Sequence, residues 1–217
     1  MDFAQAIQAL CVYAFPMIFA ITLHESAHGW MAERLGDRTA RMMGRVTLNP
    51  IPHIDPVGTI LVPGAMLVFS VLTGAGAFLF GWAKPVPINI WKFRNPKSGM
   101  GLCAAAGPLS NLLQAVFWAV LLKGLITFGV TERFFLEVCV AGIQVNIILM
   151  AVNLIPVLPL DGGRIVRSLL PESAGRLYDK SERWGFILLA LLLIFNGVGY
   201  VIDPMVRVGE AIVNAIL

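Results

Sequence analysis

The chain has 217 residues, of which 58% are hydrophobic and only 13% are Asp, Glu, Lys or Arg. Soluble domains carry about 25% charged residues, so this composition excludes an ordinary soluble globular domain. It also excludes a disordered chain, which would be rich in charge and poor in large apolar residues. The net charge of +3 arises from 16 basic and 13 acidic residues without a dense basic tract. We therefore expect no nucleic-acid partner, and we interpret the basic excess as a signal of membrane orientation.

Five stretches are long and almost free of charge, as segments that cross a lipid bilayer must be. They are residues 7–23, 57–83, 99–122, 134–160 and 185–202. None alternates polar and apolar residues as the strands of a membrane barrel would, so the pattern favours helices. The sequence predicts an all-α polytopic membrane protein, with a bundle of about four to six transmembrane helices. We expect residues 1–217 to form a single membrane-embedded domain.

The second apolar stretch, 57–83, contains more glycine and proline than a plain spanning helix would need. If it enters the bilayer and returns on the same side, 13 of the 16 Lys and Arg residues share one side of the membrane. If it crosses, the two sides hold nine and seven. Cytoplasmic loops carry an excess of Lys and Arg, so the charge pattern favours a re-entrant segment. The alternative is a chance distribution of charge over short loops.

The fourth apolar stretch ends in the sequence Asn153-Leu154-Ile155-Pro156-Val157-Leu158-Pro159-Leu160-Asp161. Its two prolines remove backbone donors and force the residues before them away from helical conformation. The sequence therefore predicts that the helix unwinds near Asn153 and leaves extended backbone at membrane depth. Such backbone is stable only where protein or a water-filled cavity covers it, which is typical of a functional site.

At the end of the first apolar stretch, His24-Glu25-Ser26-Ala27-His28 fits the pattern H-E-x-x-H. Residues four apart share one face of a helix, so both imidazoles can reach a single zinc ion. Glu25 lies about 100° round the helix from His24, where it can act as general base toward the attacking water. Three ionisable groups at the end of an apolar run are expensive to bury and are usually functional. The alternative is a polar helix end that reaches into the headgroup region.

A catalytic zinc site normally has three protein ligands and one open position, so a third ligand is expected at the same depth. Asp161 fits this role because it follows the broken helix and precedes Arg164, much as His28 precedes Arg34. In the re-entrant arrangement both points lie on the same side of the membrane. The alternative is a simple turn, since Asp and Gly are common at helix ends. The combination with H-E-x-x-H and the two prolines favours a ligand.

These motifs together resemble the site-two protease family of intramembrane zinc metalloproteases. The family pairs H-E-x-x-H on a membrane helix with a later N-x-x-P-x-x-P-x-D-G, which here spans residues 153–162. Residues 106–111, Ala-Gly-Pro-Leu-Ser-Asn, also resemble that family. The resemblance implies that His24, His28 and Asp161 bind one Zn²⁺ and that Glu25 activates water. It places Asn153 near the site, where its amide could donate a hydrogen bond to the tetrahedral oxyanion.

The resemblance further implies that the chain hydrolyses peptide bonds of membrane-anchored proteins within or beside the bilayer. It suggests a short membrane-embedded strand edge over residues 84–90 that pairs with the unwound substrate. The PDZ and CBS domains of many relatives are missing from this sequence. We expect an integral, multi-pass protein of a bacterial or archaeal cell membrane, with the active site toward the cytoplasm.

Two further residues carry open interpretations. His53, in a proline-rich stretch, is either a group near the site or, as we favour, a hydrogen-bonding residue of a loop. Asn111 either forms an ordinary interhelical hydrogen bond or lines the cavity near an expected break at Gly107-Pro108. A divalent-metal membrane transporter is an alternative function, because broken helices and polar groups also occur there. A second alternative is a non-catalytic membrane scaffold.

Overall fold

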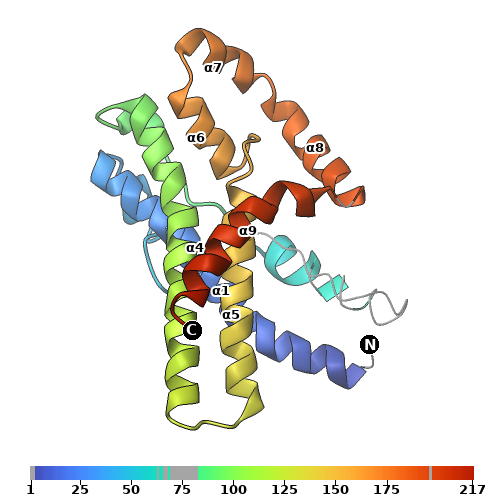
Figure 1. Cartoon of the computed structure of the whole chain (residues 1–217). Coiled ribbons are helices and arrows are strands. Elements are labelled where there is room, and N and C mark those ends of the chain that lie inside the picture. The colour runs from blue at the N-terminus through green and yellow to red at the C-terminus, as the bar shows by residue number, and fades with distance from the viewer. Residues whose placement is uncertain (1–2, 63, 66–67, 69–82, 196) are drawn as a thin grey trace.

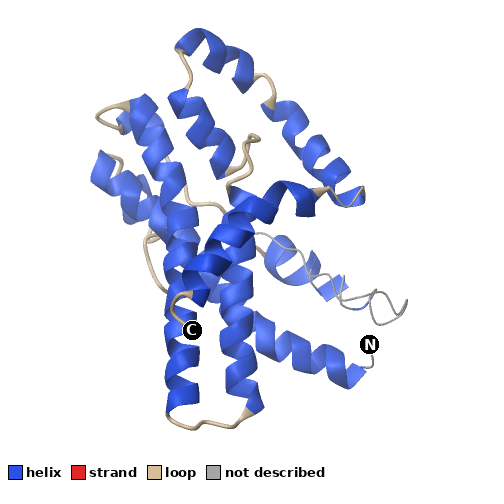
Figure 2. Cartoon of the chain, viewed as in Figure 1, coloured by secondary structure: helices blue, strands red, loops and turns tan. Residues whose placement is uncertain are grey.

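The computed structural model describes residues 3–62, 64–65, 68, 83–195 and 197–217. Within these ranges every regular element is a helix and no strand occurs (Figure 2). The three longest are α1 (Phe3–Leu35), α4 (Pro96–Thr127) and α5 (Arg133–Asn153). The others are α2 (Thr39–Met42), η1 (Ile51–His53), the π-helix η2 (Pro56–Leu61), η3 (Ile90–Lys92), α6 (Asp161–Leu169), α7 (Glu172–Asp179), α8 (Glu182–Ile194) and α9 (Val198–Asn214).

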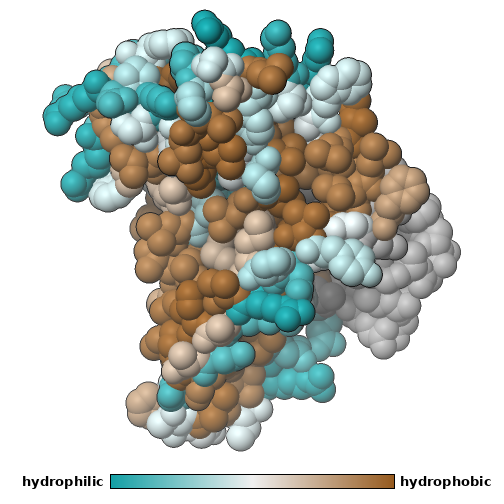
Figure 3. Space-filling view, turned by 45° about the horizontal axis from the view of Figure 1, so that its top comes forward, coloured by the Kyte–Doolittle hydropathy of each residue, from teal (hydrophilic) through white to brown (hydrophobic). Residues whose placement is uncertain are grey.

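Three helices are long and apolar enough to cross a membrane, namely Leu10–Leu35 of α1, α4 and α5. On the face shown in Figure 3, hydrophobic residues cover much of the surface beneath a hydrophilic upper end. The all-helical prediction is therefore confirmed for the described residues. The proposed re-entrant stretch lies mostly outside them, because residues 63, 66–67 and 69–82 are not described.

The last apolar stretch, 185–202, does not form the single helix that its hydropathy suggests. It is divided between α8, of 13 residues, and α9, of 17 residues, which begins after Gly197. Each falls short of the roughly 20 residues that cross a bilayer. Apolar composition alone therefore overestimated the length of the helix in 185–202, because hydropathy does not register a change of helix direction.

The three long helices form the centre of the molecule (Figure 1). Helices α4 and α5 lie side by side, α1 crosses both, and α9 packs across them. Small residues permit the close approach: a Cβ added at Gly142 of α5 would lie 2.4 Å from the ring of Trp118 on α4. In a bilayer such close packing, rather than exclusion of water, holds helices together. The core of this contact consists of Ala115, Trp118, Ala119, Leu122, Cys139, Ile143, Ile147 and Val213.

The predicted end of the helix near Asn153 is confirmed, but the extended backbone expected after it is replaced by turns. Helix α5 ends at Asn153, residues 154–160 form turns and bends, and α6 begins at Asp161. Two glycines let α6 fold back onto this segment. A Cβ at Gly162 would lie 2.3 Å from the Leu154 carbonyl oxygen, and one at Gly163 would lie 2.5 Å from the backbone nitrogen of Leu158. Asp161 is thereby held next to the segment that unwinds.

The prediction of a strand edge over residues 84–90 is wrong. Residues 84–89 are neither helix nor strand, and η3 begins at Ile90. A strand needs a neighbour to pair with, and here side chains take the backbone groups instead. The backbone N–H of Val86 donates to Glu25, and that of Asn89 donates to Asp37. Pro85 and Pro87 have no N–H to offer to a ladder.

Candidate metal centre

The structure brings the three predicted ligands together although Asp161 lies far from the two histidines in the chain. All three side chains are buried, and their ligand atoms lie within 4.8 Å of one another. The Nε2 atoms of His24 and His28 are 3.0 Å apart. Asp161 Oδ2 lies 3.3 Å from Nε2 of His24 and 3.2 Å from Nε2 of His28. Helix α1 supplies the first two through its i, i+4 spacing, and the first residue of α6 supplies the third.

The other nitrogen of each imidazole fixes which atom faces the centre. His24 Nδ1 lies 2.6 Å from the Asn111 side-chain oxygen, and His28 Nδ1 lies 2.8 Å from the backbone oxygen of Cys103. Both partners are acceptors, so each Nδ1 must carry the proton. Each neutral imidazole then presents the Nε2 lone pair to the centre. This is the arrangement in which histidine binds a metal.

Three acceptors therefore converge without a donor between them. Asp161 Oδ2 is buried and makes no hydrogen bond of acceptable geometry within the described part of the chain. A tetrahedral zinc site with bonds of about 2.0–2.2 Å has edges of about 3.3 Å. The measured separations of 3.0–3.3 Å agree with such a site.

A chain of amides supports His24 from behind. The side-chain nitrogen of Asn111 donates to Asn146 Oδ1 at 2.9 Å and to the Ala20 carbonyl at 3.3 Å. These donations orient the oxygen of Asn111 toward His24. The expected break at Gly107-Pro108 is absent, because α4 continues through Pro108. Asn111 instead contacts a candidate ligand, His24, and the sequence signals for it were its polarity within an apolar stretch and the resemblance at residues 106–111.

Gly107 also belongs to this wall of the site. A Cβ at that position would lie 2.5 Å from His28 Nε2 and 2.6 Å from His24 Cε1. The absence of a side chain on α4 therefore leaves room for both imidazoles at the point where they face Asp161. No local pattern predicts this, since the contact joins two helices that are distant in sequence.

Glu25 is close to the cluster in sequence but is held separately. Its Oε2 accepts a hydrogen bond of 2.8 Å from the backbone N–H of Val86. Asn153 makes a different contact from the one expected for an oxyanion donor. Its side-chain nitrogen donates to the Leu149 carbonyl at 2.9 Å, one turn back in α5. One hydrogen of that amide remains for another partner.

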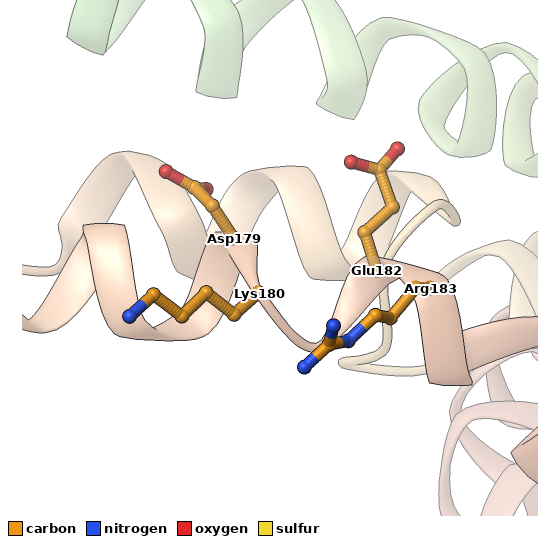
Figure 4. A pocket seen from close by; sticks show the side chains of 4 residues that line it. All are labelled: Asp179, Lys180, Glu182 and Arg183. Atoms are coloured by element: carbon orange, nitrogen blue, oxygen red, sulfur yellow. The ribbon is translucent and has the colours of Figure 1, made fainter.

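A separate hollow lies at the turn between α7 and α8. It is lined by Asp179, Lys180, Glu182 and Arg183, with the two carboxylates directed one way and the two cations another (Figure 4). Asp179 is paired with Arg167 at 2.7 Å. These residues are exposed, so the hollow is ordinary charged surface and not a second metal site.

A helical, membrane-capable bundle that buries two histidines and an aspartate, with a glutamate beside them, defines a candidate membrane metallohydrolase. Comparison with known proteins supports this assignment to a class of membrane metallohydrolases. Residues 124–195 match the description "Peptidase family M50", a region that contains Asp161 but not His24 or His28. The chain is 36% identical over 203 residues to the "Putative zinc metalloprotease YwhC" of Bacillus subtilis (strain 168), covering 89% of this chain and 85% of that protein. The chain belongs to peptidase family M50, the site-two proteases.

Two mycobacterial proteins are more distant relatives. The "Putative zinc metalloprotease Rip2" of Mycolicibacterium smegmatis (strain ATCC 700084 / mc(2)155) is 28% identical over 190 residues. Its namesake in Mycobacterium tuberculosis (strain ATCC 25618 / H37Rv) is 26% identical over 186 residues. Each match covers 82% of this chain and 64% of the relative. No solved structure matches the chain.

Proposed function

We propose that this chain is an intramembrane zinc endopeptidase that hydrolyses peptide bonds of membrane-anchored proteins within or beside the bilayer. The observation that carries the proposal is the cluster of His24, His28 and Asp161, whose lone pairs face one another with both Nδ1 atoms engaged elsewhere. Such a cluster is stable when a cation occupies it. Family membership makes zinc the expected ion.

Each group of the chain has a distinct role in this scheme. Zinc at the cluster would supply a Lewis acid that acidifies water and polarises a carbonyl. Glu25 takes the proton of the attacking water and passes it to the leaving amine. The Val86 N–H fixes one carboxylate oxygen of Glu25 and leaves the other free for this transfer. Asn153 stays a proposed oxyanion donor, through the hydrogen that Leu149 does not engage.

A helical substrate hides its carbonyl groups in intrahelical hydrogen bonds, so it must unwind before cleavage. We propose that the substrates are membrane-anchored segments with Gly, Pro or polar residues near the cleavage point. A divalent-metal transporter is less favoured, because the Glu25 carboxylate accepts a backbone N–H instead of joining the cluster. A transporter would also not require a base beside the metal.

We further propose that the stretch 57–83 is re-entrant, in a bundle of at least the three membrane-capable helices, with the site toward the cytoplasm. Contacts across this stretch support the proposal. The backbone N–H of Arg94 donates to the Leu35 carbonyl at 3.0 Å, and Lys92 Nζ donates to Thr39 Oγ1 at 2.8 Å. The segment after the stretch therefore lies beside the end of α1, and the Lys84 N–H, which donates to the His53 carbonyl at 2.9 Å, joins the residues that flank the stretch on either side. The charge distribution favours the cytoplasm for this end.

Labelling of single cysteines with an impermeant reagent tests this arrangement. Arg38→Cys and Lys92→Cys, in intact cells and in inverted vesicles, should react from the same side. Reaction from opposite sides would mean that the stretch crosses the membrane.

The proposed function is tested by Glu25→Gln. Gln has nearly the same size and can hydrogen-bond water, but it cannot accept a proton. The variant should keep its zinc and lose cleavage of a tagged membrane substrate by a factor of about 10² to 10⁴. Glu33→Gln, on the same helix and in an ion pair with Arg41, is the matched control and should cleave normally. Equal cleavage by Glu25→Gln and wild type would overturn the mechanism, and no cleavage by wild type would overturn the function.

A further inference from the structure

Residues 84–86, which are neither helix nor strand, form a short strap whose backbone contacts His53, Arg45 and Glu25. The backbone N–H of Lys84 donates to the His53 carbonyl at 2.9 Å. Arg45 Nη2 donates to the carbonyls of Lys84 and Pro85, at 2.5 and 3.2 Å. The next residue, Val86, donates its N–H to Glu25 Oε2. Arg45, His53 and Glu25 are therefore all attached to three consecutive residues.

Arg45 and His53 carry polar groups that nothing in the described part of the chain satisfies. Arg45 is 6% exposed, and its Nε has no hydrogen-bond partner. The backbone of His53 does hydrogen-bond within its loop, since its N–H donates to the Pro50 carbonyl and its carbonyl accepts from Lys84. His53 is 2% exposed, and neither ring nitrogen makes a hydrogen bond of acceptable geometry, although the Thr47 backbone lies close enough to raise the pKa of the ring. Buried groups of this kind are rare, because each loses its bonds to water without replacement.

The charges around Arg45 and His53 indicate what kind of group would satisfy their unpaired nitrogens. Arg45 has no carboxylate within ion-pair distance among the described residues. Burial and the charge of Arg45 lower the pKa of His53, while Glu25 acts in the opposite direction. The imidazole is then neutral and keeps one N–H to donate. A group that accepts hydrogen bonds and acquires negative charge during the reaction would satisfy both the Arg45 guanidinium and the His53 ring.

We propose that Arg45 and His53 are oxyanion-binding residues, which donate hydrogen bonds to the carbonyl oxygen of the scissile peptide beside Glu25. In the first step the water oxygen bonds to the carbonyl carbon, Glu25 takes the proton, and the carbonyl π electrons move onto the oxygen. Arg45 Nε and an N–H of His53 stabilise that charge. In the second step the carbonyl re-forms, the C–N bond breaks, and the Glu25 proton goes to the amine. This proposal rests on the proposed function.

The pair is better supplied for this role than Asn153. The amide of Asn153 already donates to Leu149, and no contact joins it to Glu25 among the described residues. Arg45 and His53 retain unused polar atoms, and the strap attaches both of their segments to the base. A preorganised donor of this kind stabilises the transition state because it does not have to reorient when charge develops.

The test is His53→Phe, compared with His53→Gln, in the full-length chain in detergent. Phe fills a similar volume without polar atoms, and Gln keeps an N–H donor. We expect both variants to retain zinc. For Phe, kcat should fall by about a hundredfold, the effect typical of losing one oxyanion donor, while KM changes little. Gln should restore part of that loss.

A purely structural role predicts a different result. Removing two unsatisfied buried nitrogens should leave the thermal transition of His53→Phe unchanged or raise it, so a loss of kcat without a loss of stability identifies a functional group. Arg45→Lys keeps the charge but removes Nε, and it should also lower kcat with zinc retained. Asn49→Ala is the matched control, since it removes a turn contact to Ile51 in the same segment and leaves both donors in place.

The inference is overturned if His53→Phe cleaves within about threefold of wild type, a change smaller than any oxyanion donor produces. It is also overturned if Phe and Gln lose cleavage equally together with zinc or thermal stability, or if Asn49→Ala loses as much as His53→Phe. These failures are distinguishable from failure of the proposed function. In each of them wild type still cleaves and Glu25→Gln still does not.

Discussion

The candidate metal centre and the surface cluster of Arg167, Glu172 and Asp179 are two groups of polar residues whose charges are arranged in opposite ways. At the surface, Arg167 pairs with Asp179 at 2.7 Å and with Glu172 at 3.1 Å, so opposite charges face each other. The carboxylates there are partly in water, with 46% and 63% of their side chains exposed. At the centre, His24, His28 and Asp161 are buried and present only acceptors to one another.

This difference in burial determines where the loss of a single hydrogen-bonding or charged atom should affect the protein. Surface ion pairs contribute little because water replaces a lost partner at small cost. A buried group has no such replacement, and removing its partner leaves the full cost of desolvation. Substitutions at the centre should therefore change binding and catalysis, whereas the same substitutions at the surface should change little.

The largest effect is expected for Asp161→Ala. Two histidines alone do not form a stable open zinc site, so purified Asp161→Ala should contain no zinc and should not cleave. Metal analysis by mass spectrometry measures this. Asp179→Ala removes the same side chain from the surface cluster and should keep full zinc content. Full occupancy and activity in Asp161→Ala would exclude Asp161 as the third ligand.

A smaller effect is expected for Asn111→Leu, which leaves all three ligands intact. Without Asn111 the proton of His24 Nδ1 loses its acceptor, and the orientation of the ring is no longer fixed. Loss of such a supporting group typically weakens metal affinity by about 10- to 100-fold. Competition with a chelator of known affinity measures the change. Gln114→Leu is the control, because among the described residues Gln114 contacts the same Ala20 carbonyl and no histidine. Equal affinities in the two variants would show that Asn111 does not support His24.

Asp37 provides an intermediate case, a buried carboxylate with complete partners. It accepts from the backbone of Thr39 and Asn89 and from the Thr39 hydroxyl, and Lys92 lies 3.7 Å away. Burial raises the pKa of Asp37, but these contacts outweigh it and hold the pKa below its usual value. Asp37→Asn should lower the free energy of unfolding at neutral pH by about 1–3 kcal/mol.

The pH dependence of the stability lost in Asp37→Asn follows from the direction of the pKa shift of Asp37. A carboxylate with a lowered pKa stabilises the folded state above the pKa of the unfolded chain, near 3.9, and loses this contribution as pH falls through the folded-state pKa. The stability difference between wild type and Asp37→Asn should therefore shrink below about pH 4. Denaturation in detergent at a series of pH values measures it. A constant difference would show that the charge of Asp37 is not involved.

The smallest effect is expected for Glu172→Gln at the surface cluster. Its carboxylate is 63% exposed, and Arg167 keeps Asp179 as a partner. The free energy of unfolding should change by less than about 1 kcal/mol, and cleavage should be unaffected. A loss of unfolding free energy as large as that of Asp37→Asn would mean that exposed and buried carboxylates contribute equally to stability in this protein.

The sequence determined those parts of the protein that depend on near neighbours in the chain. The spacing of His24 and His28 places both on one face because helical periodicity is a local property. The end of α5 at Asn153 follows from prolines that cannot continue a helix. The apolar stretches predicted membrane-capable helices, although composition did not register that 185–202 is divided between α8 and α9.

Only the tertiary structure decided which distant groups meet. The family resemblance suggested a strand near Val86, but a strand requires a partner, and here Glu25 accepts the backbone N–H instead. No local sequence pattern predicts that Asn111 supports His24 or that Gly107 leaves space for the imidazoles. The same holds for the unsatisfied ring nitrogens of His53. Such contacts arise from the packing of helices against one another, which a sequence specifies only through the whole fold.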